Sequence, residues 1–141
     1  MTVRKFRGGA TAARCARLAV REELGEALPR RQLADVELLV SELATNSVRH
    51  AGCGESDEIA IEADLKPDKV RVRLFDSGRG FEVRTPEPPA TGAAGGYGLV
   101  LLERLSDRWG VQRENGFSVW FELQRERLPF GDDRGPRARA A

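Results

Sequence analysis

Two long segments in the first half of the chain carry apolar residues at the spacing of amphipathic helices. The first covers residues 11–27, with an apolar side formed by Ala13, Ala16, Leu18, Ala19 and Leu24. Pro29 interrupts this pattern, and a second helix is predicted over residues 31–50. Its apolar residues fan over one broad face at about 100° per residue. They are Leu33, Val36, Leu39, Val40 and Leu43.

The remaining pattern indicates strands with one apolar face, in which apolar and polar residues alternate. In residues 69–76, for example, Val70 and Val72 alternate with Arg71 and Arg73. A short helix is predicted over residues 99–106, and Asn115-Gly116 is a strong hairpin signal. The predicted strands are residues 3–6, 58–65, 69–76, 108–112 and 117–124.

The length of the chain favours a single domain. The chain has 141 residues, enough for one core, and we expect the domain to cover residues 1–125. Residues 126–141 lose all pattern, which predicts a disordered tail.

The formal net charge is +1, and no block of like charge marks a nucleic-acid surface. No apolar run approaches transmembrane length and no signal peptide is evident, so we expect a cytoplasmic protein with no membrane partner. Cys15 and Cys53 are then two free thiols.

Glu42 and Asn46 lie one turn apart on the second helix, at the edge of its apolar face. The two side chains are separated by about 40° around the helix axis. A carboxylate and an amide oxygen in this place can reach into a cleft while the helix stays anchored in the core. The pair suits a base and a metal ligand, although such residues on helices are also commonly solvated.

Two glycine-rich segments follow. The strand that ends at Asp76 leads into Gly78 and Gly80, where the backbone can turn sharply or approach a ligand closely. Gly95-Gly-Tyr-Gly98 opens the short helix, and free N–H groups at a helix start are a natural phosphate site. The segment is not a P-loop, because no Gly-Lys-Ser/Thr follows. Residues 83–96 have no periodicity and form a loop of a length that is usually functional.

Together these three elements resemble the ATP-binding domain shared by gyrase, MutL-type repair proteins and histidine kinases, the GHKL or Bergerat fold. Residues 42–50 resemble its N box, residues 76–80 its G1 box and residues 96–99 its G2 box. Over residues 5–125 the chain looks like the small anti-sigma-factor serine/threonine kinases. The resemblance implies an α+β fold, a two-layer α/β sandwich with helices on one face of a mixed, mostly antiparallel sheet.

The resemblance also implies an ATP·Mg2+ site. Asn46 would give its side-chain oxygen to Mg2+, which takes few protein ligands. Asp76 would accept the exocyclic amine of adenine, where guanine presents an oxygen instead. Residues 83–96 would form the ATP lid. The purine would lie against Gly78 and Gly80, and the phosphates would be held by Gly96 and Gly98. Leu99 is a further nucleotide-binding residue.

Glu42 matches the glutamate proposed as the base that activates the attacking hydroxyl in kinase members. Positioning of a Mg2+-bound water and a plain surface charge remain alternative roles. Many relatives carry an arginine just before the second glycine box, where this chain has Ala93-Ala94-Gly95-Gly96. Phosphoryl transfer usually needs a cation against the developing charge. The candidates for phosphate contacts are Arg49, Arg79 and Arg84.

Two functions therefore stay open. The first is an ATP-dependent serine/threonine kinase that phosphorylates a small anti-anti-sigma (STAS-like) protein and regulates a sigma factor. The second is a noncatalytic or weakly hydrolytic ATP-binding module whose shape a partner protein reads. The resemblance implies the anti-anti-sigma protein and the sigma factor as partners, and a homodimer as a further candidate assembly.

Overall fold

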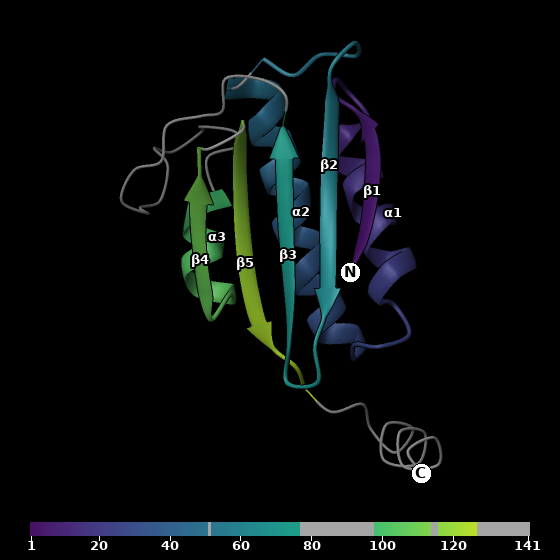
Figure 1. Cartoon of the computed structure of the whole chain (residues 1–141), viewed down its shortest axis with the longest axis vertical. Helices are drawn as coiled ribbons and strands as arrows, with labels where there is room; N and C mark the ends of the chain where they lie inside the picture. The colour runs from purple at the N-terminus through teal and green to yellow at the C-terminus, as the bar shows by residue number, and fades with distance from the viewer. Residues whose placement is uncertain (51, 77–97, 114–115, 127–141) are drawn as a thin grey trace.

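The computed structural model describes residues 1–50, 52–76, 98–113 and 116–126. Within these ranges, five strands form one sheet in the order β1-β2-β3-β5-β4, with three helices. The helices lie behind the sheet in Figure 1. The strands are β1 (Thr2–Arg7), β2 (Glu58–Leu65), β3 (Lys69–Asp76), β4 (Arg108–Gln112) and β5 (Phe117–Gln124). The helices are α1 (Ala12–Leu24), α2 (Arg30–His50) and α3 (Gly98–Leu105). This two-layer α+β sandwich is the predicted fold class.

All four strand pairs are antiparallel. The sheet of the described residues is therefore purely antiparallel, where a mixed and mostly antiparallel sheet was predicted. The reason is the place of β5, which returns from β4 and lies between β4 and β3. Because both neighbours pair antiparallel with β5, β3 and β4 run in the same direction without touching as a parallel pair.

β2 and β3 bury every second side chain, as the alternation predicted, whereas β5 also buries Ser118 and Glu122. Val70, Val72 and Leu74 of β3 are buried, and so are Val119 and Phe121 of β5. The helix layer contributes the apolar faces of α1 and α2, and the α2 face is the predicted one. On α1 the prediction was wrong for Leu18, which is 42% exposed because it lies about 200° around the helix from the buried Ala16, while Val20 is buried instead. The largest fully buried side chains of the described helices are Val20, Leu24, Val36, Leu39, Val40, Leu43 and Leu102.

The helix ends differ slightly from the prediction. α1 stops at Leu24, three residues before the predicted end, although the Gly25 N–H still donates to the Arg21 carbonyl at 2.9 Å. Residues 25–28 form a turn, in which the Leu28 N–H donates to the Leu24 carbonyl at 3.1 Å. α2 begins at Arg30, directly after Pro29, so the proline marks the boundary as predicted.

The predicted tail, residues 126–141, lies outside the described residues except for Glu126. Its carboxylate meets the Arg31 guanidinium at 2.6 Å, and its N–H donates to Gln32 Oε1 at 3.1 Å. Both partners belong to the first turn of α2. Among the described helices, none combines the length and apolarity needed to cross a bilayer.

Candidate functional site

The last two turns of α2 bring polar side chains into the interior beside the end of β3. Asn46 is 6% exposed and Ser47 is fully buried. Asp76, the last residue of β3, is 5% exposed and is held in the sheet between β2 and β5. These three polar side chains need partners or a ligand, because an unsatisfied buried polar group is costly.

Ser47 and Asp76 satisfy one another. The Ser47 hydroxyl donates to Asp76 Oδ2 at 3.0 Å, across a separation of 29 residues in sequence. This hydrogen bond fixes the orientation of the carboxylate and ties α2 to the end of β3. Asp76 was predicted as a site residue, and its partner Ser47 was missed. The helical spacing could have predicted that Ser47 points into the core, because it lies four residues after Leu43 on the same apolar face.

Asn46 is different, because its side-chain oxygen has no hydrogen-bond partner among the described residues. A buried acceptor left in this state costs roughly 1–3 kcal/mol. An amide oxygen is a hard ligand, and Mg2+ accepts one or two protein oxygens while phosphates and waters complete its shell. The orphaned oxygen therefore fits the metal that the sequence predicted at this position.

Glu42 lies one turn before Asn46 and is half-buried. Within the described part of the chain, its carboxylate takes part in no hydrogen bond or ion pair. Arg49, a predicted phosphate contact, lies exposed near the end of the same helix. α2 thus carries Glu42, Asn46 and Ser47 within two turns.

The glycine-rich predictions are described only in part. Gly78, Gly80, Gly96, Arg79, Arg84 and the predicted lid lie outside the described residues. α3 begins at Gly98 and includes Leu99, close to the predicted start of the short helix. It packs against α2, and its Val100 and Leu102 are buried. The start of α3 is thereby attached to the helix that carries the candidate site.

The segment after α2 is anchored under the site. Gly52 adopts a positive φ of 74°, and the Cys53 N–H donates to the Ser47 carbonyl at 3.1 Å. Cys53 is buried and, like Cys15, is a free thiol, as predicted. Gly8 passes so close that a Cβ there would lie 2.6 Å from the Cys53 carbonyl oxygen. The backbone of Ser47 is thereby attached to the segment that follows α2, and that segment packs closely against Gly8.

The fold and the cluster on α2 and β3 define an ATPase-type domain. The sequence pattern of the histidine kinase-like ATPase domain family matches residues 7–123, and the chain belongs to this family. Among solved structures, it is similar to the histidine kinase domain of a blue-light activated histidine kinase from Erythrobacter litoralis. That similarity has a TM-score of 0.50 and 21% identity, and it covers 79% of this chain and 58% of the other. It supports the fold.

Relatives of known name within this family are serine-protein kinases. The chain is 38% identical over 98 residues to a serine-protein kinase RsbW of Listeria innocua, a match that covers 62% of either protein. It is 31% identical over 112 residues to a serine-protein kinase RsbW of Bacillus pumilus, covering 69% of either. The chain thus spans about 62% of the length of the Listeria relative. The predicted resemblance to ATP-binding domains of anti-sigma-factor kinases is confirmed at the level of the family.

Proposed function

We propose that this protein is an ATP·Mg2+-dependent serine/threonine kinase of the anti-sigma-factor type. Its substrate would be a serine on a small anti-anti-sigma (STAS-like) protein, and its regulated partner a sigma factor. Support comes from the family membership and from the RsbW relatives named serine-protein kinases. We place this activity in the cytoplasm.

The observation that carries the proposal is the polar cluster at the end of α2. The Asn46 amide oxygen is buried without a partner among the described residues, and the adjacent residue Ser47 donates its hydroxyl to the Asp76 carboxylate. We assign Asp76 to the adenine amine, with Gly78 and Gly80 beside the purine. Gly96, Gly98 and Leu99 would bind the phosphates at the start of α3. Arg49, Arg79 and Arg84 are the candidate cations.

Asn46 would hold Mg2+ through Oδ1, and the bound ion would neutralise charge on the phosphates. Glu42 would take the proton of the attacking serine hydroxyl. The serine oxygen then bonds to the γ-phosphorus as the bond to the β,γ-bridging oxygen breaks, and ADP leaves. Because Glu42 is half-buried and close to Asn46 on the helix, it can work at the same phosphate while remaining accessible to a protein substrate.

Calorimetric titration of Mg2+·ATP tests the site. We expect wild type to bind and Asn46→Ala to lose most of the Mg2+-dependent affinity, by about 10- to 100-fold. Thr45→Ala is the matched control, because this half-buried hydroxyl only donates to the Ser41 carbonyl of its own helix at 2.9 Å. The absence of binding by folded wild type would contradict the proposal.

Phosphoryl transfer is a separate test. Labelled ATP and a STAS-like protein should give a phosphoserine with wild type, while Glu42→Ala should give none.

A noncatalytic or weakly hydrolytic ATP-binding module is the second candidate function. The sequence Ala93-Ala94-Gly95-Gly96 favours it, because no cation stands immediately before the second glycine box. ATP binding without transfer, at any STAS-like protein concentration, would select this second function.

A further inference from the structure

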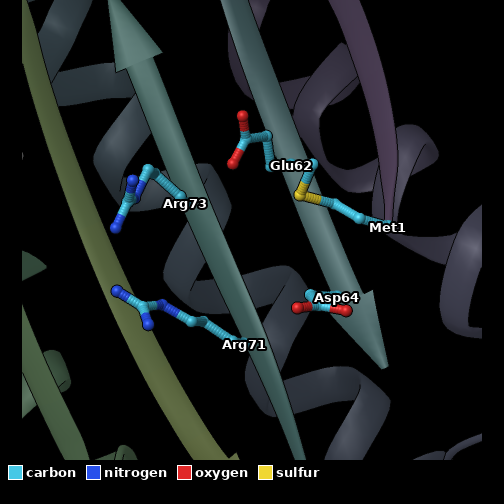
Figure 2. A pocket seen from close by; sticks show the side chains of 5 residues that line it. All are labelled: Met1, Glu62, Asp64, Arg71 and Arg73. Carbon is cyan, nitrogen blue, oxygen red and sulfur yellow. The ribbon is translucent and has the colours of Figure 1, made fainter. Parts of the chain in front are cut away.

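Strand alternation turns the side chain of Asp76 toward the helix layer. The face of the sheet opposite the helices carries charged residues that line a shallow hollow of about 180 Å³, shown in Figure 2: Met1, Glu62, Asp64, Arg71 and Arg73. Successive side chains of a strand point to opposite faces. Asp76 therefore lies on the same side of β3 as the buried Leu74, while Arg73 points the other way. The carboxylate is thus directed at α2.

Ser47 uses its hydroxyl across the core, although a partner on its own helix is within reach. A serine within a helix can donate to the carbonyl four residues before it. Thr45 does so, and its hydroxyl donates to the Ser41 carbonyl at 2.9 Å. The hydroxyl of Ser47 donates instead to Asp76 Oδ2 at 3.0 Å. This donor therefore serves the carboxylate and not the helix.

The backbones of both partners are held in place. Asp76 pairs with Ile59 of β2 on one side and with Phe117 of β5 on the other. The Ser47 carbonyl accepts a hydrogen bond from the Cys53 N–H at 3.1 Å, and its side chain is fully buried. Because neither backbone can shift easily, the hydrogen bond between the two side chains sets the plane of the carboxylate.

An aspartate alone does not decide which purine a site accepts. A carboxylate only accepts hydrogen bonds, and both adenine and guanine present donors on their Watson–Crick edge. Adenine presents its exocyclic amine. Guanine presents N1–H and its own exocyclic amine side by side, and a carboxylate can accept both with its two oxygens. A carboxylate that is able to turn can therefore bind either base.

We propose that Ser47 is a positioning residue that makes the nucleotide site selective for ATP over GTP, because it fixes the Asp76 carboxylate. The hydroxyl engages Oδ2 and prevents the carboxylate from turning both oxygens toward the base. The fixed carboxylate suits the single amine of adenine and repels the carbonyl oxygen of guanine, which is also an acceptor. A site built to bond one polar group discriminates strongly against a ligand that lacks it. The inference rests on the proposed ATP site and adds the residue that sets its base selectivity.

Calorimetric titration with three Mg2+-nucleotides tests this role. They are ATP, GTP and purine riboside triphosphate, which has no substituent where adenine has its amine. Ser47→Ala should lower the affinity for ATP by about tenfold and change that for purine riboside triphosphate by less than about twofold. The affinity for GTP should stay the same or rise, so the ATP-to-GTP ratio should fall by about tenfold or more. A purely structural role would lower all three affinities together and leave their ratios unchanged.

Two further variants control the measurement. Thr45→Ala, on the same helix, should keep the wild-type ratio. Asp76→Asn already lacks the charged acceptor, so adding Ser47→Ala to it should change the ratio by less than about twofold. Circular dichroism shows whether each variant folds. If Ser47→Ala does not fold, Ser47→Cys takes its place in the test, because a thiol is a weak donor of similar size.

The outcomes separate this inference from the proposed function. If wild type binds ATP but the Ser47 variant keeps the wild-type ratio, or loses all three affinities equally, the role of Ser47 is wrong and the ATP site stands. Wild type that binds GTP as tightly as ATP would also overturn the inference alone. Folded wild type that binds none of the three nucleotides would refute both the inference and the proposed function.

Discussion

The hydrogen bond between Ser47 and Asp76 makes a quantitative prediction about stability. Both groups are buried, and the hydroxyl donates to a carboxylate oxygen at 3.0 Å. A hydrogen bond to a charged group contributes roughly 1.5–3 kcal/mol, and a carboxylate left short of a donor pays its own desolvation cost. Ser47→Ala gains about 0.5 kcal/mol of helix propensity. The net loss should therefore be about 1–2.5 kcal/mol.

Urea unfolding at neutral pH without nucleotide measures this loss. The expected change corresponds to a fall in Tm of about 3–8 °C for a domain of this size. Thr45→Ala is the control on the same helix, and we expect it to change stability by less than about 0.5 kcal/mol. Its hydroxyl only donates back to the Ser41 carbonyl, an arrangement that slightly disfavours the helix.

A double-mutant cycle assigns the loss to the pair. Asp76→Asn and Ser47→Ala should show a coupling of about 1–2 kcal/mol when they are combined, as groups in direct contact do. If Ser47→Ala were as stable as Thr45→Ala, or if the two changes were simply additive, the hydrogen bond would not hold Asp76 in place.

Three further predictions address the site and the surface. Glu42→Gln should keep ATP affinity within about twofold and lower transfer by roughly 100-fold or more, as measured with labelled ATP, because it removes only the base. Asp76→Asn should weaken ATP binding by about tenfold while leaving triphosphate binding intact, which titration with ATP and inorganic triphosphate compares. The hydrogen bond from Arg4, at 2.6 Å, lowers the pKa of Glu23. Its stabilisation is thus present above the unfolded-state pKa and lost as the pH falls through the lowered value, so Glu23→Gln should flatten the acid side of a stability–pH curve.

Much of the fold could be predicted from the sequence, because periodicity reports burial directly. The alternation in residues 69–76 and the apolar face of α2 each have one physical solution once a core must form. The pairing order of the strands is different. The placement of β5 between β3 and β4 depends on contacts between distant segments, and no local pattern contains it. The mostly antiparallel sheet was predicted correctly, and it is purely antiparallel rather than mixed within the described residues for that reason.

The candidate site residues were chosen from the sequence for their chemistry. The residue that holds one of them in place was missed, because its role depends on a contact between distant segments. Asn46 and Asp76 stood out because their types and spacing suit a ligand. Ser47 was passed over because a serine beside a motif carries no chemical signal of its own. Its meaning depends on Asp76 reaching it from β3, 29 residues away in sequence. The exposure of the sheet face that carries Arg71 and Arg73 was equally hidden. The alternation along β3 shows that the two arginines share a face, but whether a helix covers that face depends on the tertiary structure.

The state of Asn46 leads to a prediction that links stability to function. Its side-chain oxygen has no partner among the described residues, which would destabilise the ligand-free protein by about 1–3 kcal/mol, and alanine is a better helix former by about 0.5 kcal/mol. Asn46→Ala should therefore make the ligand-free protein more stable, by about 1–2 kcal/mol after some loss of packing.

The same substitution should have the opposite effect when Mg2+·ATP is present. A ligand at 100 times its Kd stabilises the folded state by about 2.7 kcal/mol, which wild type should show as a rise in Tm. Asn46→Ala should show little rise, so the order of stability of the two proteins should invert between scanning calorimetry runs without and with nucleotide. A variant less stable than wild type in both runs would mean that Asn46 is a structural residue, with a partner that forms in solution. Inversion would mean that the unpaired Asn46 oxygen lowers the stability of the ligand-free domain and that the bound Mg2+·ATP removes this cost.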